Sequence, residues 1–353
     1  NDGQNAFVFG TNPFGIEYDG QVMAEGQTGQ GGAGSGAINV NWDADWTVRT
    51  HTSERGWEAE FAIPLRTLRY AVGDDQTWGV NAVRNIRRKN EQVFLSHVPR
   101  GYGLQRVSSA GKLTGLKLSA RRDLRATPFA AGSVNDDRTA ATGTQRVGDV
   151  GVDVKWGVRA DLTLDVTVNT DFAQVEADEQ QVNLTRFPLF FPERRPFFLE
   201  NAQVFQLGQP QAVDLFFSRR IGLSSTGTPI GIVGGARLSG KLGGFNVGLL
   251  DMQTEAAVNP RTGAALAPAN NFAVARLQRE VGRSTFGAMF VGRHATGNRA
   301  GADDFNRAFG ADVGWQATAN GRLKAFIART GSPDARGGTD YAGRLAYVYA
   351  NPL

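Results

Sequence analysis

Carboxylates gather in one segment where they could act as metal ligands. The acids that follow a strand-like run are Asp171, Glu176, Asp178 and Glu179, and carboxylate oxygens of this kind are the ligands that calcium takes. Arginines are numerous nearby, so ion pairs across a polar interior are the favoured interpretation, with calcium as the alternative and no other cofactor expected. The arginines expected to pair with these acids are Arg194, Arg195, Arg219 and Arg220.

The remaining acid–base candidates do not assemble into a catalytic pattern. Glu58 and Glu60 share one strand face, but a single strand cannot place both carboxylates on opposite sides of a glycosidic bond. His51, His97 and His294 are scattered singly, without the spacing of metal ligands. The sequence therefore predicts no catalytic residue and no metal centre.

Two glycine patterns imitate phosphate-binding loops. Residues 29–34 match the spacing GxGxxG, but no helix pattern follows them. Residues 235–241 match a phosphate loop, yet Leu242 stands where a magnesium-binding Ser or Thr is needed. The only basic run that stands out is 84–89, so we expect no nucleotide cofactor and no nucleic-acid partner.

Sugar binding is the chemistry that the tryptophans suggest, because indoles stack on the C–H faces of sugar rings. Trp42 and Trp46 flank the acidic residues Asp43 and Asp45, and this setting predicts that both indoles are exposed. Trp57 and Trp78 lie within strand patterns and are expected in the core. Trp42, Trp46, Asp43 and Asp45 are therefore the candidate carbohydrate-binding residues, with core packing as the competing use.

A segment rich in proline and phenylalanine lies between Asp171 and Asn201. Its prolines remove backbone donors, so neither a helix nor a central strand can run through it. We expect residues 172–211 to form an insert that plugs a polar-lined barrel, with Arg194 and Arg195 pairing with acids on the strands. The other residues of this predicted plug network are Glu193, Glu200, Asp171, Glu176, Asp178, Arg219 and Arg220, and the strand acids nearest to the arginines are Asp153, Asp165, Asp171 and Glu176.

Long alternating runs flank this segment and predict antiparallel strands with one apolar face. The clearest pair of runs is 149–157 and 161–169, and their pattern predicts a β-hairpin. Gly243-Gly244, Gly282-Arg283 and Asn320-Gly321 supply residues suited to tight turns. The strands expected in this half are 124–134, 147–157, 161–170, 213–219, 230–242, 245–253, 272–281, 285–294, 305–317, 322–330 and 341–349.

Several longer motifs resemble a known family. QVEAD at 174–178, FFPERRPFFLEN at 190–201 and FFSRRIG at 216–222 are similar to a bacterial outer-membrane β-barrel family of unknown function, the domain of unknown function 5916. In that family the barrel follows a module similar to family-9 carbohydrate-binding domains. NPFGIEYDG at 12–20 and GWEAEFAIPLRTLRY at 56–70 resemble the end of such a module, so the resemblance covers nearly all of the chain.

The resemblance implies an all-β protein in two parts. Residues 1–118 are expected to be the end of a carbohydrate-binding-like β-sandwich, residues 112–125 to include a hinge, and residues 119–353 to begin an antiparallel outer-membrane-type barrel with the plug inside. Both ends of the sequence are interpreted as cut. Composition agrees, because the chain has no cysteine and a mean hydropathy of -0.30, and no run approaches the roughly 18 apolar residues of a transmembrane helix.

Two functions remain open. The first is an outer-membrane barrel whose module, in the periplasm or at the cell surface, binds or handles glycan without catalysis; its partners are carbohydrate and outer-membrane lipid. The second is a secreted carbohydrate-binding appendage of a polysaccharide-degrading enzyme, in which case any activity is hydrolysis of O-glycosyl compounds. Charged residues on the inward strand faces favour the barrel, since a soluble sandwich fills its interior with apolar side chains.

Overall fold

The structure is a computed structural model, and it is all-β, with one short α-helix among the residues that it describes. It forms two compact units, 1–121 with 180–200, and 122–179 with 201–353. The described residues are 5–22, 25, 38–40, 42–65, 67–68, 70, 73–118, 124–136, 144–159, 161–169, 193, 195–209, 213–224, 230–258, 265–282, 284–297, 301, 304–318, 321–333 and 339–349.

The N-terminal unit consists of short strands in small sheets. Strands β1, β2 and β3 form one sheet, while β4–β5, β6–β9 and β7–β8 pair two by two. The first unit also contains the helical turn α1 (Pro196–Leu199). The strands are β1 (Ala6–Gly10), β2 (Tyr18–Val22), β3 (Ile38–Asn39), β4 (Thr47–Ser53), β5 (Gly56–Ala62), β6 (Gly73–Val80), β7 (Val83–Ile86), β8 (Glu91–Phe94) and β9 (Gly111–Leu118).

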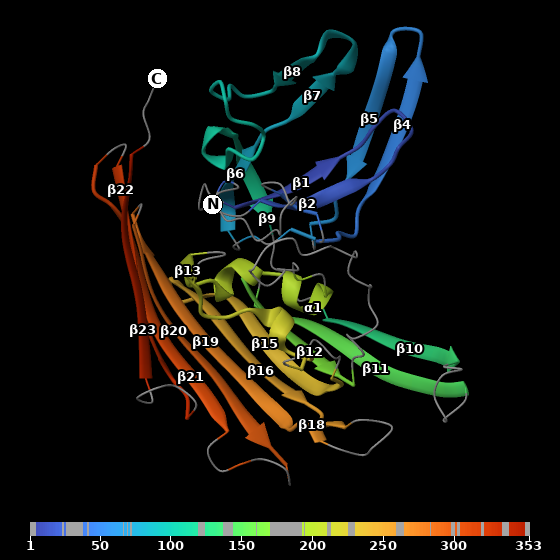
Figure 1. Cartoon of the computed structure of the whole chain (residues 1–353). Coiled ribbons are helices and arrows are strands. Elements are labelled where there is room, and N and C mark those ends of the chain that lie inside the picture. The colour runs from blue at the N-terminus through green and yellow to red at the C-terminus, as the bar shows by residue number, and fades with distance from the viewer. Residues whose placement is uncertain are drawn as a thin grey trace. The chain divides into compact units, whose positions relative to one another are not determined.

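The second unit is built on a ten-stranded antiparallel sheet, whose strands Figure 1 shows side by side. Among the described strands the sheet is open, with β10 and β23 at its edges. Its members, in spatial order, are β10 (Leu124–Asp136), β11 (Thr144–Arg159), β12 (Leu162–Val168), β15 (Ile232–Leu242), β16 (Phe245–Thr254), β19 (Ala269–Val281), β20 (Ser284–Thr296), β21 (Phe305–Gln316), β22 (Gly321–Gly331) and β23 (Thr339–Tyr349).

Alternation and turn chemistry predicted this sheet well. Each of its strands overlaps a run expected from the sequence, and the pair β11–β12 is hydrogen-bonded as foreseen. Gly243 and Gly244 have φ values of 58° and 82°, and Gly282 has 60°, which is the left-handed backbone that a tight hairpin requires. Asn320 lies outside the described residues.

Three local predictions were wrong. The apolar pattern of residues 78–84 predicts a single strand, but the run is interrupted between Val80 and Val83, so it gives the ends of two strands, β6 and β7. Residues 112–118, expected within a hinge, belong to β9, which pairs with β6. The run 213–219 contains only the short strand β14 (Val213–Asp214), paired with β13 (Gly208–Gln209), and then a 3-10 turn, η5 (Ser218–Arg220). Short apolar runs do not distinguish strand from turn by periodicity alone.

The two faces of the large sheet have opposite character. The apolar side chains predicted to share one face are exposed, as Val150 and Val168 show with 69% and 50% of their surface accessible. We call this the exposed face. It continues across the sheet with Trp156, Leu249, Leu277, Phe286, Phe309, Trp315, Ile327, Tyr341, Leu345, Tyr347 and Tyr349.

The opposite face, here called the covered face, buries polar side chains. Thr167 and Ser239 are fully buried, and Arg237 and Arg276 are 2% and 3% exposed. Register pairing places these residues on the side opposite to the exposed valines, leucines and aromatics. Apolar side chains are buried among them, since Leu250 and Met252 on the same face are 4% and 0% exposed. The sheet therefore differs from a half-buried sheet of a water-soluble protein in its exposed face, which is apolar where such a sheet is polar.

Candidate functional site

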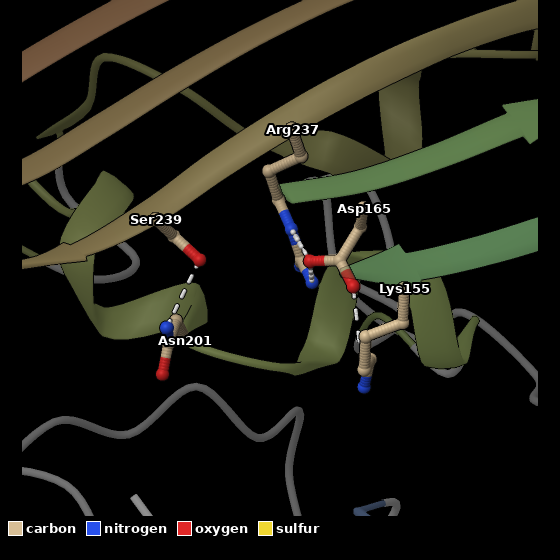
Figure 2. Close-up of polar contacts among 5 residues, drawn as sticks. All are labelled: Lys155, Asp165, Asn201, Arg237 and Ser239. Atoms are coloured by element: carbon tan, nitrogen blue, oxygen red, sulfur yellow. Dashed lines mark hydrogen bonds and ion pairs between the residues drawn. The ribbon is translucent and has the colours of Figure 1, made fainter. Parts of the chain in front are cut away.

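A row of three charges crosses the covered face. Lys155 on β11, Asp165 on β12 and Arg237 on β15 are direct register partners, so their side chains lie on the same side (Figure 2). Arg237 donates to Asp165 Oδ2 from Nη2 at 2.7 Å and from Nε at 3.3 Å, while Lys155 Nζ lies 3.9 Å from Oδ1. One buried carboxylate therefore balances cations from both neighbouring strands.

Neutral polar groups extend the same cluster. Thr167 donates its hydroxyl to Asp153 Oδ1 at 2.6 Å, across the register pair that follows Lys155 and Asp165. On the other side Asn201 Nδ2 donates to Ser239 Oγ at 2.9 Å, and both residues are buried (Figure 2). Asn201 has φ of 54°, a left-handed conformation that asparagine tolerates better than most residues. The buried side chains of this cluster, Thr167, Asn201 and Ser239, thus have hydrogen-bond partners, as the low dielectric of the site requires.

Asn201 begins a segment that lies over the covered face, which we call the strap, residues 201–209 and 213–224. It contains the 3-10 turn η4 (Ala202–Phe205), the small hairpin β13–β14 and η5. Gly248 on β16 has Val204 and Phe205 against it, since a Cβ there would lie 2.8 Å and 2.9 Å from them. Gly310 on β21 is likewise covered by Leu207 and Leu215. The strap therefore reaches from β15 to β21 across the polar interior.

A second ion pair spans three strands. Arg276 Nη1 on β19 donates to Asp312 Oδ1 on β21 at 2.6 Å. Between them lies Gly287 on β20, where any Cβ would overlap both the guanidinium and the carboxylate. A further pair, Arg293 with Asp304 at 2.7 Å, is more accessible. Glycine at 287 thus leaves room for the close approach of these charges, and any larger side chain would have to displace the ends of Arg276 and Asp312.

Comparison with known proteins finds that part of this region is similar to one family. Residues 121–232 match the model of the family described as Domain of unknown function (DUF5916). No curated protein matches the chain. The match covers about a third of the sequence, so the predicted resemblance to this family is confirmed for that part. It includes Lys155, Asp165 and Asn201 and stops at Ile232, before Arg237 and Ser239.

In the described part of the predicted plug, the side chains of neighbouring residues contact one another. Glu193 accepts from Arg195 Nε at 2.8 Å and from Nη2 at 2.7 Å, and both residues are buried. The Arg195 guanidinium lies 4.4 Å from the ring centre of Phe198, which meets Phe197 edge-on at 5.1 Å. Clustering of phenylalanines is therefore present at these two positions, while pairing of Arg195 with strand acids stays a prediction.

The other predicted network residues are dispersed or lie outside the described part. Glu200 is half-buried, and in η5 Arg219 is half-buried while Arg220 is exposed. The residues outside the described part are Asp171, Glu176, Asp178, Arg194, Phe187, Phe190 and Phe191. Among the described residues no group of three or more His, Asp or Glu side chains could hold a metal ion.

The prediction that Trp42 and Trp46 are exposed was wrong. They are 7% and 4% exposed and pack with Phe7, Phe9 and Phe61, the last stacked on Trp46 at 5.5 Å between ring centres. The Trp46 indole donates to Asp19 Oδ2 at 3.1 Å. Neighbouring acids suggested exposure, but Asp43 and Asp45 point to solvent while the intervening chain turns both indoles inward. Trp57 and Trp78, expected in the core, are only half-buried.

Sequence reasoning did not single out the residues that hold the covered face together. Arg237, Ser239, Arg276 and Asp312 attracted no attention because they lie singly within strands. A signal was available, since β12, β15, β19 and β21 each place a charged residue, Asp165, Arg237, Arg276 and Asp312, within an alternating run. Charges in that position are costly unless they are paired, so their repetition from strand to strand indicates a shared polar interior.

Proposed function

We propose that residues 122–353 form a wall of a bacterial outer-membrane β-barrel, with the exposed face against lipid and the covered face toward a lumen closed by the strap. The continuous apolar character of the exposed face carries this proposal. Phe309, Ile327 and Leu345 are 57%, 63% and 69% exposed, whereas Arg237 on the opposite face is 2% exposed. Monomeric soluble proteins rarely present so continuous an apolar surface to water.

Strand length supports the same reading. A strand crosses the hydrocarbon layer with about 9–11 tilted residues. The strands from β15 to β23 in the sheet are 10 to 13 residues long. None of the helices in the described chain is long and apolar enough to cross a membrane.

A soluble secreted assembly is the competing function. It requires a second layer over the exposed face, because a half-buried sheet in water turns its apolar side inward. Leu249 and Leu277 in the middle of the sheet are 45% and 46% exposed, which disfavours such a layer.

The connections between strands are short at one end of the sheet and longer at the other, and this difference supports an orientation of the sheet in the membrane. Gly243-Gly244 and residues 282–283 are tight turns at one end, while residues 255–268 and 297–304 form longer connections at the other. Outer-membrane barrels have short periplasmic turns and longer outer loops. Leu124, where the chain enters β10, pairs with Trp156 near the short-turn end of β11, so the preceding residues are proposed to be periplasmic.

For the N-terminal unit we retain a proposed role in binding carbohydrate at the envelope, but on a different indole. Trp57 is half-buried, and the Arg84 guanidinium lies 5.3 Å from its ring centre. A partly accessible ring beside a fixed cation offers both a stacking surface and hydrogen-bond donors to a sugar. The burial of Trp42 and Trp46 disfavours this role for their indoles.

Fractionation of cells that express the full-length protein tests the membrane proposal. The protein should remain with outer-membrane markers in a density gradient and resist extraction by alkaline carbonate. Recovery from the culture medium or the soluble periplasm would contradict it.

A separate titration of the purified protein with oligosaccharides tests the glycan role. Trp57→Ala should lose binding that Trp78→Ala retains. Absence of binding to any sugar would exclude the glycan role and leave the membrane proposal unaffected.

A further inference from the structure

The hairpin β7–β8 ends in a concentrated positive charge, which we call the basic tip, residues 84–89. Arg84, Arg87, Arg88 and Lys89 are all exposed, and Figure 1 shows the two strands side by side in teal. The 3-10 turn η2 (Arg87–Lys89) carries three of these cations in succession, and left-handed Asn90, with φ of 53°, closes the turn. Successive residues of so tight a turn project in different directions, so the cations spread over the end of the hairpin.

Little negative charge offsets the basic tip. Glu91 is the one acid between residues 84 and 91, and it lies 3.8 Å from Lys89 with both side chains about half accessible. A surface pair of this kind is weak and readily exchanged for another anion. The Arg84 guanidinium packs against the Trp57 ring. This contact holds the hairpin in place but leaves the positive charge of Arg84 unneutralised.

Aliphatic side chains accompany the cations. Val93 is the register partner of Arg84 and is 53% exposed, and Leu95, whose backbone N–H donates to Ala82 at the other end of the hairpin, is 73% exposed. Cations bordered by exposed aliphatic side chains match the boundary of a lipid bilayer, where headgroup charge and acyl chains meet. An acidic polysaccharide would use the cations but leave Val93 and Leu95 without a partner.

From this combination we infer that the basic tip docks on the anionic lipid surface of a membrane. The proposal concerns the N-terminal unit and stands whether or not the large sheet spans a membrane. Each cation near an anionic surface contributes about fivefold to partitioning at low salt. Replacing Arg87 and Arg88 by glutamine should therefore weaken binding by about 25-fold.

An environment-sensitive dye on a single cysteine measures this docking in the whole chain, which has no cysteine of its own. Asn90→Cys places the dye at the basic tip, and Glu54→Cys places it at the tip of the β4–β5 hairpin as a matched control. The labelled protein is added to vesicles that contain phosphatidylglycerol and to vesicles of phosphatidylcholine alone. We expect a blue shift at position 90 with the anionic vesicles only, reduced by high salt, and none at position 54.

Charge variants decide the outcome. Arg87→Gln with Arg88→Gln should lose the shift, while Arg87→Lys with Arg88→Lys should keep it, and circular dichroism checks that both fold. An equal shift at positions 54 and 90 would overturn the proposal, because it would report adsorption of the whole chain. A response to a soluble acidic polysaccharide with none to anionic vesicles would overturn it in favour of a glycan partner.

Discussion

Asp165 is the residue on which the covered face depends most directly, because Lys155 and Arg237 approach its carboxylate from two strands. The ion pair of Asp165 with Arg237 is therefore more stable in this buried position than either charge would be without its partner. Burying an ion pair gives little net stability, whereas removing one partner leaves an uncompensated charge and costs about 3–5 kcal/mol. The cluster therefore contributes mainly by fixing the register of β11, β12 and β15, and adds little to the net stability.

Asp165→Leu should lower the free energy of unfolding by about 3–5 kcal/mol, because Arg237 then stays buried without its carboxylate. Urea unfolding of the refolded protein in lipid, followed by tryptophan fluorescence, measures this loss. The control is Asp161→Leu, whose pair with Arg159 at 3.6 Å is more accessible and is worth at most about 1 kcal/mol. Equal losses for the two variants would contradict a specific role of Asp165.

Gly287→Ala tests the close approach of Arg276 and Asp312. The added methyl group overlaps both charged ends, so the pair must separate, and overpacking of this kind costs about 1–3 kcal/mol. Gly148→Ala on β11 is the control, since a Cβ there meets nothing within 4 Å. The same unfolding assay applies, and a Gly287→Ala variant as stable as Gly148→Ala would show that the pair adapts without cost.

Trp46→Ala should destabilise the N-terminal unit by about 3–5 kcal/mol, the usual cost of deleting a buried aromatic side chain. Asp43→Ala, at an exposed position beside it, should change stability by less than about 0.5 kcal/mol. Thermal unfolding monitored by near-ultraviolet circular dichroism compares the two variants. A small effect of Trp46→Ala would mean that its indole is not part of the core.

At the scale of elements, the sequence was informative wherever one physical rule dominated. Period-two alternation predicted every strand of the large sheet, and paired glycines predicted the turn between β15 and β16, because each signal is local. The strap was predicted only in part, with residues 201–209 at the end of the expected insert and residues 213–219 as a strand. Its contacts with Gly248 and Gly310 join residues far apart in the chain, and such pairings leave no local trace. For Trp42 and Trp46 the composition was ambiguous, since aromatic residues serve in cores and in sugar sites alike.

Leu249→Arg tests the exposed face of the sheet. Leu249 lies mid-strand on β16 between Leu238 and Ala275, so an arginine there would meet the middle of the lipid layer and cost about 2–4 kcal/mol. Val281→Arg, at the end of β19 and 55% exposed, should cost about 0–1 kcal/mol because it lies near the interface. Folding yield into vesicles is the measurement, and equal yields for the two variants would argue against a lipid contact.

At the scale of the whole molecule, the open question is which end of the large sheet faces the periplasm in the proposed outer-membrane location. Short turns close one end of the sheet and longer connections the other, and the chain enters β10 near the short-turn end. If the short turns face the periplasm, the residues that precede β10 lie on that side, and the proposed lipid and glycan partners of the N-terminal unit are periplasmic. Because the chain has no cysteine, one introduced thiol at each end reports the orientation without interference.

Thr318→Cys and Ala256→Cys are the matched pair for this test. Thr318 is exposed at the short-turn end, between β21 and β22, and Ala256 is exposed at the opposite end, just after β16. A membrane-impermeant maleimide should label Ala256→Cys in intact cells, and Thr318→Cys only after the outer membrane is opened, since short turns of such barrels are periplasmic. The reverse pattern would place the short turns outside the cell and with them the residues that precede β10. Labelling of both thiols in intact cells would contradict a membrane-spanning sheet altogether.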